Sequence, residues 1–290
     1  MKKTRRNHKK IEPDKLFCAI VLTLFCLMII FPFINVLAIS LSSRLPVSQG
    51  RVWLWPVGFN LEAYKRALTY DGFLRSYLNT IRYTLMDTII SLIITLLTAY
   101  PLSKSYLRGR KFFNIYFVFT MLFSGGLIAS YINMTKMGLN GTIWAVLLPA
   151  ACSPYTIILV RTFFEQIPSS IEESAFIDGA NDFYVFSQIT IPLSKPVIST
   201  VVLLFAVNRW NSWFSEFIYL SDKKLYSHQL VIRSIVLTGE SEGVMQVGEA
   251  VLGQSLKYAV VILAMVPMLI LYPLIQKYLV KGIMLGAVKG

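Results

Sequence analysis

Two segments of the chain contain polar, charged or small residues at spacings that indicate a functional site. In both segments the residue types predict binding of another molecule and not the making or breaking of bonds. The first segment, residues 165–195, is acidic and holds two small residues, Ala175 and Gly179, four positions apart. Residues at this spacing lie on one face of a helix, so the pair predicts a bare patch where another backbone can approach closely. A short helical hairpin with such a patch is suited to a groove on a partner protein.

The local structure of this segment can also be predicted. Ser169 and Ser170 each stand three residues before a glutamate, a spacing that favours a capping box at a helix N-terminus. The helix should run to Asp178 and end at Gly179, which tolerates the left-handed backbone. Asn181 or its neighbour can cap a second short helix. An amphipathic helix lying on lipid is the other interpretation, but five acidic residues would be repelled by anionic lipid.

The second segment is a polar cluster inside an otherwise apolar run. Its amides and hydroxyls are spaced as one helical face: Asn208, Asn211, Ser212 and Ser215. Amides beside tryptophans suit a neutral sugar, which needs hydrogen bonds to its hydroxyls and stacking on its C–H faces. The predicted substrate path therefore consists of Asn208, Arg209, Trp210, Asn211 and Trp213. The alternative is hydrogen bonding between helices, or an ion pair between Arg209 and Glu216.

Other kinds of site are not predicted. We expect no catalytic residue, no cofactor-binding residue and no metal site, because the chain has only three cysteines and two histidines, and these are scattered. A phosphate-binding sequence of the form G-x-x-x-x-G-K-[ST] is also missing, so any ATP hydrolysis must come from a separate subunit. The pair Gly125-Gly126 is expected to allow close helix packing or a kink.

The elements that position these segments are membrane helices. Hydrophobic residues make up 55% of the 290-residue chain and charged residues only 15%, with a mean hydropathy of +0.60. A soluble domain usually has about 25% charged residues, so an all-α integral membrane protein is expected. Six apolar runs are long enough to span a bilayer, namely 16–41, 80–102, 112–134, 141–164, 196–220 and 257–280.

Charge placement predicts the topology. Residues 1–15 form a basic N-terminal segment, and the six-span domain occupies 16–290, with its first apolar run too long for a cleaved signal peptide. The positive-inside rule then places 1–15, 103–111, the loop 165–195 and the tail on the cytoplasmic side, with both termini inside. The outer loop at 53–60 is rich in tryptophan, which is typical either of an interfacial aromatic belt or of a docking surface for an external protein.

A family resemblance rests on the spacing within the cytoplasmic loop. Glu173-Ser174-Ala175, then Gly179, Ile189 and Ile191-Pro192 resemble the EAA loop of ABC importer permeases, whose pattern is E-A-A-x3-G-x9-I-x-L-P. Every spacing matches, with Ser174 and Ile191 as conservative departures. The six-run layout is similar to that of MalG-type sugar permeases of binding-protein-dependent importers. The last eleven residues resemble the LplC/YtcP subgroup of these permeases.

The resemblance implies a type I ABC importer permease with a cytoplasmic EAA coupling helix. It implies that Glu173, Ser174, Ala175, Gly179, Ile189 and Pro192 couple the permease to an ATPase. Implied partners are a second, paralogous permease subunit, two ATP-binding subunits that hold ATP and Mg, and an extracytoplasmic solute-binding protein. No nucleic acid partner is implied. The implied function is carbohydrate or oligosaccharide import across a bacterial cell membrane, and the chain itself is not an enzyme.

A different class of protein remains to be weighed. An ion-coupled secondary transporter of a small solute would need charges deep in several spans and often has internal repeats. The apolar runs contain only Asp87, Arg209 and Glu216 as candidates, and no repeat is visible. The sequence names neither the sugar nor the ATPase, and it does not decide between a homodimer and a heterodimer.

Overall fold

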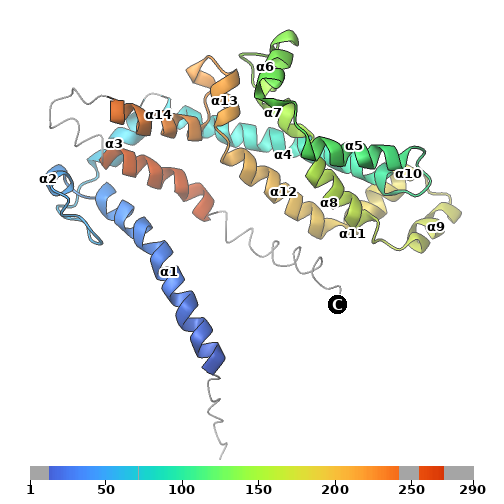
Figure 1. Ribbon diagram of the computed structural model, residues 1–290, viewed down its shortest axis with the longest axis horizontal. Helices are drawn as coiled ribbons and strands as arrows, with labels where there is room; N and C mark the ends of the chain where they lie inside the picture. The colour runs from blue at the N-terminus through green and yellow to red at the C-terminus, as the bar shows by residue number, and fades with distance from the viewer. Residues whose placement is uncertain (1–12, 71, 242–254, 271–290) are drawn as a thin grey trace, which may run out of the picture. The chain divides into compact units, whose positions relative to one another are not determined.

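The computed structural model describes residues 13–70, 72–241 and 255–270, and its regular structure there is helical (Figure 1). The described residues form no β-strand and only one isolated bridge, between Ser42 and Phe59. The prediction of an all-α protein is therefore confirmed for this part of the chain. The chain divides into two compact units, which are described separately: 1–69 with 236–263, and 70–235 with 264–290.

The described helices include several that could cross a membrane. Three are long and apolar enough alone: Asp14–Ser40, Phe73–Ser103 and Trp144–Phe164. Two bent helix pairs, Arg110–Leu122 with Gly126–Lys136 and Asp182–Leu193 with Lys195–Trp210, raise the number to five if each pair is one span. A further apolar helix, Ser255–Ile270, covers the start of the expected sixth run, whose remainder lies outside the described residues. The count of six stays a prediction.

The first unit contains α1 (Pro13–Ser40), α2 (Arg44–Ser48) and α3 (Glu62–Thr69). Asn60 accepts a hydrogen bond from the Glu62 N–H at 2.7 Å, which satisfies one of the free donors at the start of α3. Glu62 in turn pairs with Arg44 at 2.7 Å and with Arg66 at 2.9 Å. These contacts give the polar segment after α1 a defined structure.

The second unit is built around α4 (Phe73–Ser103), which packs against α12 (Lys195–Trp210), α8 (Pro154–Phe164) and α7 (Trp144–Ala151). Figure 1 shows α4, α8 and α12 side by side, with α5 (Arg110–Leu122) beside them. Their contact buries a continuous apolar core, to which the hydrophobic effect contributes about 25 cal/mol per Å². The main members of this core are Leu96, Ala99, Tyr100, Ile157, Val160, Phe164, Val201 and Phe205.

Helix α4 begins seven residues before the apolar run that predicted it. Gly72 adopts a left-handed backbone with φ of 80° and starts the helix. Side-chain hydrogen bonds hold the first turns of α4 against a later segment of the chain. The Asn79 amide donates to the carbonyls of Lys224 and Tyr226, and the Tyr83 hydroxyl donates to that of Leu225. Those carbonyls lie in and beside a 3₁₀ turn, η2 (Lys223–Leu225).

The expected third run is sharply bent. Helices α5 and α6 (Gly126–Lys136) meet at an angle of 111° across Gly125-Gly126. Gly126 has φ of 78°, a left-handed conformation that side chains other than glycine rarely adopt. Of the two roles expected for the glycine pair, the structure therefore shows the kink.

The acidic segment folds into four short helical pieces. They are α9 (Ser169–Ile177), α10 (Asp182–Tyr184), the π-helical η1 (Val185–Thr190) and α11 (Ile191–Leu193), and α12 follows after a bend of 81°. The Asn181 side chain caps α10 by accepting the Tyr184 N–H at 2.8 Å, as predicted. The predicted serine capping box does not form, because Pro168 occupies the N-cap position of α9.

The remaining elements of the second unit follow α12. They are α13 (Phe214–Tyr219), the 3₁₀ turn η2, and α14 (His228–Ser241), which begins in this unit. His228 is fully buried against α4, where its ring lies 3.6 Å from that of Tyr77 and its backbone N–H donates to Thr80 Oγ1 at 2.7 Å. The start of α14 is thereby fixed to the first turns of α4.

Candidate functional site

The turn at Gly179 exposes backbone where the sequence predicts a bare patch. Gly179 has φ of 86°, and its N–H bonds the Phe176 carbonyl at 3.1 Å. The next N–H, that of Ala180, reaches back to the Ala175 carbonyl at 2.9 Å, which completes a left-handed helix end. A Cβ placed on Gly179 would meet no atom within 4 Å. The turn is open space within this chain, so a partner could pack there.

A hollow of about 460 Å³ lies beside this turn, and three of the predicted coupling residues line it, namely Ala175, Gly179 and Ile189. The other three lie elsewhere on the loop. Glu173 is exposed on α9, and the Ser174 hydroxyl donates to the Ser170 carbonyl at 2.8 Å. Pro192 is exposed in the short helix α11. The structure thus brings half of the predicted set around one hollow.

Large apolar side chains stand out from the same loop. Ile177 is 86% exposed, Phe183 is 73% exposed, and Phe176 and Tyr184 are also exposed. Contiguous exposed apolar groups with a polar surround mark interaction surfaces. Ile177 has the largest exposed fraction of these four, and sequence reasoning missed it because its position beside Gly179 lacks a distinctive spacing signal.

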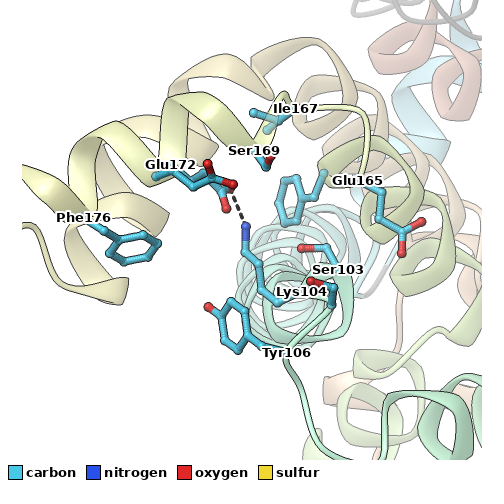
Figure 2. Close-up of a pocket in the computed structure, with 11 residues that line it drawn as sticks. Ser103, Lys104, Tyr106, Glu165, Ile167, Ser169, Glu172 and Phe176 are labelled. Carbon is cyan, nitrogen blue, oxygen red and sulfur yellow. Dashed lines mark hydrogen bonds and ion pairs between the residues drawn. The ribbon is translucent and has the colours of Figure 1, made fainter.

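The acidic residues of the loop divide into two groups. Three are paired with side chains of the α4–α5 loop or of the first residue of α5: Glu172 with Lys104, Glu165 with Arg110, and Asp182 with Tyr106 (Figure 2 shows the first pair). The other two, Glu173 and Asp178, are exposed and form no ion pair among the described residues. The outward-facing charge of the loop is therefore smaller than its composition indicates.

Tyr106 illustrates the environment of these pairs. Its hydroxyl donates to Asp182 Oδ1 at 2.9 Å. Burial, together with this hydrogen bond and the nearby carboxylate charge, raises the pKa of Tyr106 to about 12. The tyrosine therefore stays a hydrogen-bond donor throughout the physiological pH range.

Sequence reasoning missed the partners of these acidic residues. Lys104 and Arg110 entered it only through the charge rule for topology, and Tyr106 did not enter it at all. A usable signal was present, because a basic loop and an acidic loop predicted on the same side of the membrane should attract each other. The pairing of individual residues, however, depends on the packing of α4 against α8.

The predicted substrate path meets a break between helices. Helix α12 ends at Trp210, and α13 begins at Phe214, so the polar residues do not form one continuous helical face. Arg209 and Glu216 are both buried and form an ion pair, and the Ser212 hydroxyl also donates to Glu216 at 3.2 Å. The break at residues 211–213 lies between the two members of this ion pair.

The five predicted path residues occupy different environments. Arg209 and Trp210 are buried within the chain, Asn208 and Asn211 are exposed, and Trp213 is half-buried. The guanidinium carbon of Arg233 lies 3.8 Å from the ring centroid of Trp213, a cation–π contact. Within the described residues, no group of three or more His, Cys, Asp or Glu side chains could hold a metal ion.

Comparison with known families decides the class of protein. Residues 14–285 match the model of the family described as binding-protein-dependent transport system inner membrane component. The chain belongs to this family. It is therefore a membrane component of a transport system, and the expectation that it is not an enzyme follows from that membership.

Two relatives of this permease are similar over nearly the whole chain. Protein LplC of Bacillus subtilis is 38% identical over 265 residues, which cover 90% of each chain. The polygalacturonan/rhamnogalacturonan transport system permease protein YtcP of the same organism is also 38% identical, over 93% of this chain and 96% of its own length.

A solved structure is similar to the permease in fold and sequence. It is that of a bacterial ABC transporter involved in the import of the acidic polysaccharide alginate, with a TM-score of 0.85 and 35% identity. The match covers 93% of this chain and 98% of that chain. The permease fold is thus that of a known ABC importer subunit.

Proposed function

We propose that this permease is a membrane-spanning subunit of an ATP-driven ABC importer that moves a carbohydrate or oligosaccharide delivered by an extracytoplasmic binding protein. Family membership supports the binding protein, and the names of YtcP and of the alginate transporter support a saccharide. A second solved structure, of the alginate transporter with a pentasaccharide-bound periplasmic protein, has the same fold at a TM-score of 0.60.

The coupling surface for the ATPase is formed by α9, the Gly179 turn, and the following short helices η1 and α11. Its residues are Glu173, Ser174, Ala175, Gly179, Ile189 and Pro192. The observation that carries this assignment is the open hollow at Gly179, because a left-handed glycine with nothing beside it leaves room for a partner. Exposed Ile177, two residues before Gly179, supplies further apolar area.

The assembly and topology follow from the same reasoning. The partners are a second permease subunit, two ATP-binding subunits that hold ATP and Mg, and the solute-binding protein. The membrane domain has six spans at about 16–41, 80–102, 112–134, 141–164, 196–220 and 257–280. The N-terminal segment 1–15, the coupling loop 165–195 and the C-terminus lie on the cytoplasmic side.

The substrate path includes the exposed polar residues at the break between α12 and α13. We expect cysteine placed at Asn208 or Asn211, or at Trp213, to react with small water-soluble thiol reagents at a rate that changes with ATP. The native cysteines must be replaced first, because Cys18, Cys26 and Cys152 are exposed and free. Protection of all three positions in both nucleotide states would contradict a path role.

The function itself is tested by reconstitution in proteoliposomes with the ATPase, the partner permease and the binding protein. Saccharide uptake should require ATP and the ATPase subunit, because this chain lacks a phosphate-binding loop. Uptake driven by an ion gradient in the permease alone would overturn the proposal in favour of a secondary transporter.

A further inference from the structure

Helix α9 of the coupling loop is held to the α4 side of the second unit mainly by polar side-chain contacts. A hollow of about 340 Å³ lies between α9 and the loop that follows α4, lined by residues of both segments, among them Ser103, Tyr106, Ser169 and Phe176. The main contact of α9 with another helical element is with η1. Because packed apolar contact is sparse on the α4 side, the polar pairs there determine how α9 is held.

The most buried of these pairs joins Lys104 to Glu172 (Figure 2). The two side chains are 8% and 13% exposed, respectively. The Lys104 ammonium also lies 4.4 Å from the ring centroid of Tyr100, a cation–π contact within α4. A buried charge without its partner is costly, so each member strongly constrains the other.

Two more exposed polar contacts join the same two segments, one before α9 in the chain and one after it. Before α9, Arg110 pairs with Glu165, and the Arg110 Nε–H donates to the Leu102 carbonyl at 3.0 Å. After the Gly179 turn, Tyr106 donates to Asp182. The α4–α5 loop, residues 104–109, together with the start of α5, therefore binds the coupling segment before, within and after α9.

The position of Lys104 connects α9 directly to the centre of the unit. Lys104 is the C-cap residue of α4, and its N–H donates to the Pro101 carbonyl at 3.0 Å. Helix α4 is the one on which α7, α8 and α12 pack. A displacement of α9 transmitted through Glu172 would thus act on the end of the helix that organises the bundle.

We propose that Lys104 is a positioning residue for transport, and that its ion pair with Glu172 carries the movement of α9 to α4. The two adjacent glutamates of α9 then have different roles. Glu172 faces inward and ties α9 to α4, whereas exposed Glu173 is available to the ATPase. This inference rests on the proposed function, since it assumes that an ATPase moves α9.

The test compares Lys104→Met, Glu172→Gln and the charge-swapped double variant, Lys104→Glu with Glu172→Lys, in the reconstituted transporter. Lys111→Met is the matched control, because Lys111 is an exposed lysine one residue beyond Arg110 for which no ion pair is seen in the described part of the chain. Four quantities are measured: permease abundance, saccharide uptake, co-purification of the ATPase, and ATP hydrolysed per saccharide imported.

For each single variant we expect uptake to fall about tenfold, within the range of coupling between linked sites, while the ATPase still co-purifies. ATP hydrolysed per saccharide should rise by a similar factor, and the double variant should recover most of the wild-type ratio. Lys111→Met should match the wild type.

A purely structural role would give a different result. Abundance and uptake would then fall together, with the ATP consumed per saccharide unchanged, and the inference would be overturned. Single variants with wild-type uptake would overturn it as well. Failure of the wild-type assembly to import a saccharide with ATP would instead refute the proposed function, so the two failures are distinguishable.

Discussion

The coupling loop and the break between α12 and α13 are both rich in polar residues, but they use them in opposite ways. At the break, Arg209 and Glu216 are buried and form an ion pair with each other. On the coupling loop, Glu173 and Asp178 remain exposed beside an open glycine turn. Polar residues in an apolar sequence therefore signal internal structure in one region and a surface for a partner in the other, and the difference lies in which side chains find partners within the chain.

The largest effect should come from breaking the buried pair at the break. Arg209→Met leaves the Glu216 carboxylate without its partner, which should cost about 3–5 kcal/mol of stability. The thermal unfolding midpoint of the permease in detergent should fall markedly. Arg209→Met combined with Glu216→Leu is the control, because it removes both charges and should recover much of the loss. An unchanged midpoint for Arg209→Met would show that the pair contributes little.

The coupling loop should respond in transport rather than in stability. Gly179→Leu places a branched side chain where we propose that the ATPase packs, which should cost about 1–3 kcal/mol of binding by overpacking. Uptake per membrane permease should collapse, and the ATPase should co-purify less.

The matched control for Gly179 is Gly138→Leu. Gly138 is also left-handed, with φ of 69° and open space around it, so it incurs the same backbone strain away from the coupling loop. Equal losses of uptake in the two variants would mean that strain, and not a partner, explains the effect.

Acid should weaken the packing of His228 against α4. Burial lowers the pKa of His228 from 6.5 to about 4, so the folded state holds the neutral ring while an opened state takes up a proton. Stability is thus fully present above pH 6.5 and is lost as pH falls toward 4, by up to about 1.4 kcal/mol per pH unit.

The measurement is the thermal midpoint between pH 7.5 and pH 4.5, with His228→Phe as the control. Phenylalanine preserves a ring beside Tyr77 but does not titrate, so its midpoint should vary less over this range. A wild-type midpoint that does not fall with acid would contradict the prediction.

The smallest effect should come from charge reversal at Glu173. Its side chain makes no ion pair among the described residues, so Glu173→Lys should leave the thermal midpoint unchanged. Uptake should fall a few-fold through loss of a surface ion pair with a basic group on the ATPase, an interaction typically of about 0.2–1 kcal/mol. Wild-type uptake by this variant would exclude a coupling role for Glu173.

Local signals in the sequence predicted local structure well. The left-handed Gly179 and the Asn181 cap follow from side-chain properties within a few residues, and both are present. The serine capping box failed because Pro168, and not a serine, occupies the N-cap position of α9, and Glu172 pairs with Lys104 instead. The contact of Glu172 with Lys104 joins residues 68 positions apart, which no pattern spanning four residues encodes.

The dependence of local structure on distant residues also explains why the predicted substrate path differs from the observed structure. Periodicity predicted one continuous helical face, but the pairing of Arg209 with Glu216 accompanies a break at residues 211–213. The ion pair was foreseen as an alternative from its spacing alone. The burial that distinguishes Arg209 and Trp210 from exposed Asn208 and Asn211 depends on neighbouring helices, which no short spacing encodes.

The π-helical segment η1 has a consequence for changes in chain length. Such a segment holds one more residue per turn than regular α-helix needs, so a single deletion within Val185–Thr190 could be absorbed by reverting to α-helix. Each residue of an α-helix turns the chain by about 100°, so a second deletion, or an insertion, would instead rotate the Gly179 turn relative to α12. Insertions and longer deletions here, unlike most substitutions, would therefore re-aim the proposed docking surface, which gives a physical reason for the spacing between Gly179 and Ile189.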